Sequence, residues 1–404
     1  MKRLTLLLLG LALGVSATAN AQGLTMQMSN GWSFTFAGNV NVFWVFSKAN
    51  TAAGDASNSS IRTGLLPTFA TFEAKGKEAG LNLGIHFGFA PQIQNSGQAH
   101  DIFVGGLVAG AQIDMRQVYL TVGFKDGSQI LAGRELGLFE RQAILNDMTL
   151  FGVGAVGIGG AQGGGTTLGR IGFGYLYPNF NAQVTYSTKP GEAQLSVGLF
   201  QPSPLGGIFA VSPYTFTTIP RVEAEFTYNQ KSGKNNYMAW VNGLWQTTKN
   251  APTGGNSVTS FGGSAGVKGS FSDLTVVVTG YIGKGVGTTF VFSGDEIAAD
   301  GTTARPSDGG YVQLMYKVGP KTNVGASWGF SRLKDDQTGD GDADVRSNMY
   351  AYTVGIYHQW TRSLKLVFEG TQEGTTGESA GPLFSGLLPG SKQTDVSAGL
   401  MLFF

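Results

Sequence analysis

The sequence contains no cysteine. Disulfides, thiolate metal sites and lipid attachment through an N-terminal cysteine are therefore excluded. Charged residues are also scarce: they make up 13% of the 404 residues, about half of their usual share in a soluble globular protein. After the N-terminal segment, no apolar run reaches the length of about 18 residues that a membrane-spanning helix requires. Glycine and aromatic residues are abundant instead, with 63 glycines and an aromatic share of 11%.

Residues 1–21 have the features of an export signal. Lys2 and Arg3 form a positive start, residues 4–15 are apolar, and residues 19–21 read Ala-Asn-Ala, a cleavage sequence for signal peptidase. The sequence therefore predicts a signal peptide over 1–21 and one mature domain over 22–404. Without Lys2 and Arg3 the chain keeps 25 basic residues against 26 acidic ones, so no basic face for nucleic acid is expected.

The dominant pattern in the mature chain is a strict alternation of apolar residues with small or polar ones. In residues 81–89, for example, leucine, isoleucine and phenylalanine alternate with asparagine, glycine and histidine. Residues 118–124 and 324–330 repeat the pattern. Successive side chains of a strand point to opposite faces, so each segment is predicted to be a strand with one apolar and one polar face.

The connections between these segments alternate between short and long. The short ones are 76–80, 125–128, 231–234, 319–322 and 361–363, and the long ones are 49–65, 92–113, 135–168, 203–219, 248–259, 286–308, 334–346 and 373–392. This layout is typical of outer-membrane β-barrels. We count 16 strands, which we favour, if residues 169–178 belong to the third long connection or are a bent extension of the next strand, and 18 if residues 207–214 form an extra strand.

Alternating strands also suit a soluble β-sandwich, in which the apolar faces pack inward. Two features favour an all-β, antiparallel transmembrane barrel. Aromatic residues gather near the ends of several segments, as at Trp44 and Trp360, and the last segment, 394–404, ends the chain on an apolar strand. A soluble protein rarely leaves such an edge uncovered, because unpaired strand edges promote aggregation.

Two blocks of sequence and the C-terminal residue carry a resemblance to a known family. The blocks are "DMRQVYLTVGFKDGSQILAGRELGLFE" (114–140) and "GRIGFGYLYPNF" (169–180), and the last strand ends on Phe404. The chain resembles the general porins of the Gram-negative outer membrane. The resemblance implies a third loop folded into the barrel as a constriction, Arg170 at the start of the return strand, and Phe404 as an assembly signal. It also implies a homotrimer in contact with lipid and lipopolysaccharide.

A glycine run interrupts this pattern between residues 150 and 165. Gly152, Gly154 and Gly157 spell G-x-G-x-x-G, the fingerprint of dinucleotide binding. That fingerprint requires a helix after it and an acidic residue about 20 positions on, but the following residues are rich in glycine and contain no acid up to Gly191. We therefore expect no nucleotide and no other cofactor. The run is interpreted as a loop folded against the barrel wall, with a surface loop as the alternative.

Charged residues fall into two groups. Six flank or close the glycine run and are predicted to form a pore constriction: Arg134, Glu135, Glu140, Arg141, Asp147 and Arg170. Surface ion pairs, each worth about 0–1 kcal/mol, are the alternative. Asp147 is the last acid before Glu192, so cation selectivity through loop carboxylates is not implied. Seven more share the polar parity of their strands and are predicted to line the lumen: Arg221, Glu223, Glu225, Lys317, Lys365, Glu369 and Asp395.

The sequence gives little support for calcium binding or for catalysis. Asp336 and Asp340 lie at the first and fifth places of a calcium-loop pattern, but Ser347 stands where the pattern needs Glu, so they are a weak calcium site at most. The three histidines are far apart in the sequence, and no catalytic arrangement is recognisable. The chain is expected to be a porin for small hydrophilic solutes and ions and not an enzyme. A substrate-specific channel for a sugar, peptide or organic anion, and a non-conducting adhesin or anchor, are the alternatives.

Overall fold

The computed structural model describes residues 23–51, 54–93, 113–157, 165–205, 214–251, 253–292, 296–298, 302–335, 344–377 and 390–404. The predicted signal peptide lies outside these residues. The strands are β1 (Leu24–Gln27), β2 (Ser33–Thr51), β3 (Gly54–Arg62), β4 (Phe69–Glu78), β5 (Leu81–Pro91), β6 (Ile113–Gly123), β7 (Gln129–Leu136), β8 (Phe180–Ser187), β9 (Ala193–Phe200), β10 (Arg221–Ser232), β11 (Asn235–Lys249), β12 (Ser257–Phe271), β13 (Leu274–Lys284), β14 (Pro306–Gly319), β15 (Thr322–Asp335), β16 (Asp344–Gln359), β17 (Leu364–Thr376) and β18 (Lys392–Phe403).

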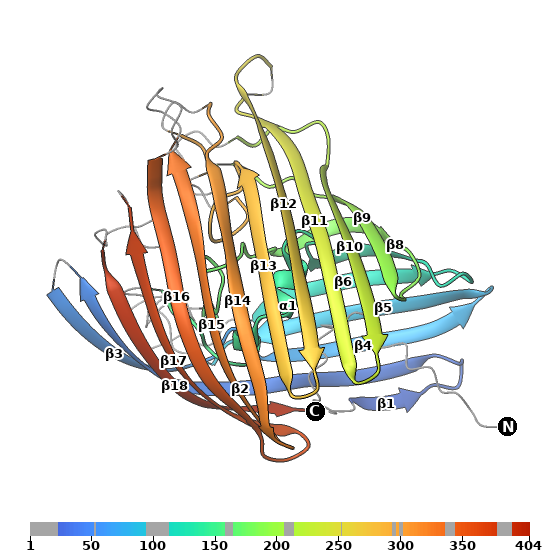
Figure 1. Cartoon of the computed structure of the whole chain (residues 1–404). Coiled ribbons are helices and arrows are strands. Elements are labelled where there is room, and N and C mark those ends of the chain that lie inside the picture. Colours follow the sequence, from blue (N-terminus) through green and yellow to red (C-terminus); the bar gives the residue numbers. More distant parts are fainter. Residues whose placement is uncertain are drawn as a thin grey trace, which may run out of the picture.

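The strands form one antiparallel sheet that closes on itself. Each strand from β4 to β18 pairs with its neighbour along the chain, while β2 pairs with β18 on one edge and with β4 on the other. The result is a closed ring of 16 strands, β2 and β4 to β18, which confirms the strand number that we favoured. Figure 1 shows strands β10 to β16 running side by side at a tilt, with the C-terminus near the ends that carry the turns β10–β11 and β12–β13.

Two further strands, β1 and β3, lie beside β2, the strand at which the ring closes. This strand is long enough to pair with two other strands on each of its edges. On one edge, β1 pairs with Ser33–Phe36 and β18 with Asn39–Asn50. On the other, β4 pairs with Ser33–Asn39 and β3 with Phe43–Thr51. Our expectation of a long connection over 49–65 was therefore wrong, because residues 54–62 continue the sheet as β3.

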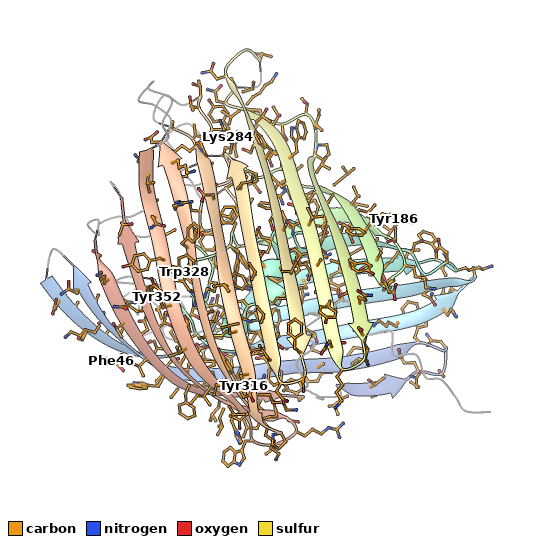
Figure 2. The ribbon with its side chains drawn as sticks, viewed as in Figure 1. Phe46, Tyr186, Lys284, Tyr316, Trp328 and Tyr352 are labelled. Atoms are coloured by element: carbon orange, nitrogen blue, oxygen red, sulfur yellow. The ribbon has the colours of Figure 1, made fainter. Side chains whose placement is uncertain are left out.

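The outer face of the ring is mainly apolar, whereas the inner face carries most of the buried polar and charged side chains of the strands together with some apolar ones. Along β10, for example, the buried residues Arg221, Glu223 and Glu225 alternate with Val222, Ala224 and Phe226, of which Phe226 is 40% exposed. Figure 2 labels five exposed aromatics on strands around the ring: Phe46, Tyr186, Tyr316, Trp328 and Tyr352. A soluble sandwich would bury its apolar faces, so this inverted arrangement is that of a transmembrane β-barrel. No helix among the described residues is long and apolar enough to span a membrane.

The long connection after β7 differs from our expectation in its end point. It runs from residue 137 to residue 179 and holds the short helix α1 (Arg141–Leu145) and the 3-10 turn η1 (Met148–Phe151). Residues 169–178 belong to this connection, which is one of the two alternatives that give 16 strands. Arg170 does not begin the return strand, because β8 starts only at Phe180.

The closing seam leads to the first prediction. Gly38 and Phe404 exchange two backbone hydrogen bonds of 3.0 Å each, and a Cβ at Gly38 would overlap the carbonyl oxygen of Phe69. A Gly38→Val substitution should cost about 1–3 kcal/mol or more through overpacking and lower the yield of the folded, heat-modifiable species on gels. Gly319→Val is the matched control, because a Cβ there meets no atom within 4 Å. Equal yields for both variants would contradict this account of closure.

Candidate functional site

The candidate site is built from the β7–β8 connection, meaning the described residues 137–157 and 165–179, and from the inner face of the barrel wall. Irregular backbone leaves N–H and C=O groups that a sheet would have paired, and buried groups of this kind need partners. Many of those partners are other backbone groups, and a second set consists of side chains on the inner parity of β10 to β18.

Two glutamates of β10 hold the first part of the connection. The Oε2 atom of Glu223 accepts hydrogen bonds from the backbone N–H groups of Leu138 and Phe139, at 2.7 and 2.9 Å. Glu225 forms an ion pair of 2.5 Å with Arg141 on α1 and accepts a second hydrogen bond from the Gln142 amide. Because both glutamates are almost fully buried, these contacts fix the start of the connection against β10.

The middle of the connection binds β14. Gln313 accepts a hydrogen bond from the Met148 N–H at 2.6 Å and donates one to the Asn146 carbonyl at 3.1 Å. The Tyr311 hydroxyl donates to the Ala143 carbonyl at 2.8 Å. These three bonds satisfy backbone groups at the end of α1 and the start of η1.

The glycine run binds carboxylates of the barrel wall. The Oε2 atom of Glu369, on β17, accepts from the N–H groups of Val153 and Gly154 at 2.6 and 2.8 Å. Further along the same strand and on the same face, Glu373 accepts from Gly157 at 3.0 Å. Gly154 and Gly157 have φ values of 57° and 94°, a backbone region that favours glycine. The run thus presents N–H groups to an anion, and in this structure the anions are wall carboxylates.

Two buried charges hold the returning half of the connection. Arg170 donates to the Ser327 hydroxyl at 3.0 Å and to the Ala351 carbonyl at 2.6 Å, which attaches it to β15 and β16. Asp147 accepts from the Thr149 N–H at 2.9 Å and from the Tyr175 hydroxyl at 2.9 Å. Burial raises the pKa of the Asp147 carboxyl, and nearby Arg170 opposes that effect.

A cavity of about 470 Å³ lies between the connection and the other side of the barrel wall. The connection lines it with mostly apolar side chains: Ile144, Leu145, Leu150, Val156, Leu168 and Ile171. The wall lines it mainly with polar ones from β4 to β8, among them Glu73, Lys75, His86, Gln117, Tyr119, Thr121 and Gln183. The two faces of the cavity therefore differ in chemistry.

The six residues predicted to form a constriction do not all come together at one place. Glu135 and Arg141 line the cavity. Glu140, Asp147 and Arg170 are buried in contacts that hold the connection in place, and they are not among the residues lining the described cavity. Arg134 is exposed and pairs in register with Val118 and Ala182, so it lies on the opposite face of β7 from Glu135.

The seven residues predicted to line the lumen lie on the inner parity of their strands: Arg221, Glu223, Glu225, Lys317, Lys365, Glu369 and Asp395. Glu223, Glu225 and Glu369 bind the connection as described above. The Lys365 ammonium lies 3.9 Å from the ring centroid of Phe151 in η1. Asp395 accepts a 2.5 Å hydrogen bond from Ser47 across the β2–β18 seam. Lys317 is exposed near the turn after β14.

Several residues of the site were missed in the sequence. Glu73 and Lys75 lie at inner positions of β4, where the alternation marks them, and they form a 2.6 Å ion pair. Glu373 was assigned to a loop although it lies in β17. Arg116 carries no parity signal, because the register of β5 and β6 shifts beside it, between Gly88 and Phe89. This bulge lets Arg116 reach the cavity although the alternation would not predict it.

No described residues form a cluster of three or more metal-ligating side chains of the acidic, histidine or cysteine type. The weak calcium candidates Asp336 and Asp340 lie outside the described residues. The C-terminal Phe404 packs its ring 5.1 Å from that of Phe36, beside the backbone pair with Gly38. Its predicted role as an assembly signal stays a prediction.

Solved structures with the same fold are outer-membrane proteins. The outer membrane channel DcaP of Acinetobacter baumannii superposes with a TM-score of 0.65 at 14% identity, over 94% of this chain and 99% of that one. The anion-selective porin from Comamonas acidovorans gives 0.62 at 15% identity, over 92% and 100%. Salmonella typhi OmpF, in a complex with daunomycin, gives 0.55 at 11%, over 94% and 100%. No protein-family model matches the chain, and no curated protein matches it in sequence. The fold is therefore that of the outer-membrane porins.

The carboxylates that hold the glycine run can be tested directly. A Glu369→Leu substitution leaves the N–H groups of Val153 and Gly154 without their acceptor, at a cost of about 1–3 kcal/mol for each buried group. Amide hydrogen exchange at these two residues should accelerate by about tenfold or more. Glu369→Gln keeps one acceptor oxygen and should have a smaller effect. Unchanged exchange in the leucine variant would show that the carboxylate does not hold the run.

Glu140 leads to a prediction of pH dependence. Burial raises the pKa of its carboxyl from 4.5 to about 8, so the folded protein binds a proton that the unfolded chain releases between these two values. Stability should therefore fall as pH rises from about 4.5 to about 8. Glu140→Gln should flatten this part of a plot of the unfolding midpoint against pH. Glu192→Gln, in the exposed turn after β8, is the control and should leave the slope unchanged.

Proposed function

We propose that this chain is an outer-membrane porin, a water-filled channel through which small hydrophilic solutes and ions diffuse passively. The observation that carries the proposal is the combination of an apolar outer face, which fits lipid, with a polar inner face that surrounds a cavity. The titles of the similar structures describe a channel and porins, which supports the proposal by analogy of fold.

We infer that the β7–β8 connection narrows this channel from within. A ring of 16 strands encloses a lumen wider than its own side chains fill. The connection donates backbone hydrogen bonds to inner-face residues of β10, β14 and β17, and its other side lines the cavity. A segment held in this way reduces the open cross-section to the space between the connection and strands β4 to β8.

A homotrimer in contact with lipid and lipopolysaccharide stays a prediction from the resemblance. One of the similar structures is titled as a trimer form, the OmpT protein of Vibrio cholerae. Sizing in mild detergent distinguishes a trimer from a monomer.

A substrate-specific channel is the second candidate function, and the two unlike faces of the cavity favour it. Saturable block of ion current by one solute class would support this candidate. A non-conducting barrel that acts as an adhesin or anchor is the rival of a different class, and it would give no current at all.

Bilayer measurements on a pair of arginine variants test the proposal. The wild-type protein should give stepwise, ohmic conductance in a planar bilayer. Arg141→Gln should shift the reversal potential in a salt gradient toward cations, because Glu225 keeps its charge beside the cavity without its partner. Arg134→Gln is the matched control, since Arg134 is exposed on the other face of β7, and it should leave the reversal potential unchanged. A protein without conductance would refute the channel function.

A further inference from the structure

The cavity has a polar side chain that no protein group satisfies. His86, on β5, lines the cavity and is only 3% exposed. Neither of its ring nitrogens makes a hydrogen bond of regular geometry with the described residues, although the Gln117 side chain lies within reach of the ring. The neighbouring Gln117 amide donates instead to Glu135, at 2.8 Å. A buried polar group without a partner is costly, so the imidazole is available to a molecule that enters the cavity.

The ring of His86 is also held in a fixed orientation. It stacks on Tyr119 of β6 with a centroid distance of 4.8 Å and an interplanar angle of 9°. Because the two residues are direct register partners, the barrel itself sets this stack. Hydrogen-bonding positions that are fixed in advance lower the entropic cost of binding.

The charged groups that line the cavity are already engaged, either in ion pairs or, for Arg62 and Glu135, in hydrogen bonds with neutral groups. Lys75 pairs with Glu73 at 2.6 Å, Arg116 with Asp114 at 2.7 Å, and Arg141 with Glu225 at 2.5 Å. A charged solute would lose its hydration without gaining a counter-charge that is not already engaged, which is unfavourable. An uncharged solute avoids this cost.

The two sides of the cavity differ in polarity. The connection offers apolar side chains such as Ile144, Leu150 and Ile171, while the wall opposite offers the hydrogen-bonding groups of His86 and Thr121. A small molecule with one apolar face and one polar face matches both sides at once. The cavity volume is within the usual range of about 300–1,000 Å³ for small-molecule sites.

We propose that the cavity is a binding subsite for small uncharged solutes with an apolar side and hydrogen-bonding groups on the other, and that His86 is its principal polar contact. The proposal rests on the proposed channel function, and it adds the class of solute that the channel retains in passage. A binding subsite predicts that the solute binds saturably, whereas a channel without one would discriminate between solutes by size alone.

N-acetyl-leucinamide is the probe, because it carries an apolar side chain and two uncharged amides. It should reduce the single-channel current saturably, and N-acetyl-glycinamide, which lacks the side chain, should bind at least about tenfold more weakly. N-acetyl-leucine, whose carboxylate is charged, should also bind more weakly. Equal block by the leucine and glycine amides, or stronger block by the carboxylate, would overturn the proposal.

Substitution of two separate histidines gives a test variant and a control variant. His86→Leu should weaken the block by N-acetyl-leucinamide roughly fivefold to tenfold, the effect of about one hydrogen bond. His358→Leu is the control, because His358 lies near the end of β16 and its Nδ1 contacts the Thr322 hydroxyl at 2.8 Å. Equal block in wild type and in His86→Leu would refute the role of His86.

Binding can also be measured without conduction. Saturation-transfer NMR of the detergent-solubilised wild type should detect N-acetyl-leucinamide and not the glycine analogue. Conductance without this binding would refute the subsite and leave the porin function standing. Binding without conductance would refute the porin function and leave the subsite standing.

Discussion

The structure depends on one constraint: inside a membrane, every backbone N–H and C=O group needs a partner within the protein. A sheet meets this need only if it has no open edge, and here β2 closes the ring. Its 19 residues pair with β18 and β1 on one edge and with β4 and β3 on the other. The approach is close enough at Gly38 that the chain has no space for a side chain there.

The same constraint accounts for the wall acids. The β7–β8 connection cannot pair its backbone as a sheet does, so Glu223, Glu369 and Glu373 accept from its N–H groups. This explains why a G-x-G-x-x-G run occurs in a barrel. Glycines let consecutive N–H groups converge on one anion, which is the property that nucleotide-binding loops use for phosphate. Here Gly154 and Gly157 donate to two different carboxylates, Glu369 and Glu373, so the run shares with nucleotide-binding loops the use of glycine and not a common ligand.

Most of the barrel could be predicted from the sequence, because a period of two residues fixes which side chains share a face. The inner positions of Glu223, Glu225 and Glu369 followed from that rule alone. The rule fails where the chain departs from the regular pairing of the β-sheet. Arg116 lies beside a bulge, Arg170 lies in irregular backbone 10 residues before β8 begins, and nothing in the sequence says that Asp147 meets Tyr175. These positions depend on contacts between distant segments, which local patterns do not encode.

Some charged residues in this barrel hold the connection in place, and others face the space that a solute enters. The number of charged residues therefore does not indicate the electric field that acts on a solute. Glu223 and Glu369 are engaged with backbone N–H groups, and Arg170 is engaged with β15 and β16. The connection then turns its apolar side chains toward the remaining space. Because the acids on β10 and β17 hold the connection in place, the polar side of the cavity is formed mainly by the opposite wall, where His86 and Tyr119 stack among polar and charged neighbours.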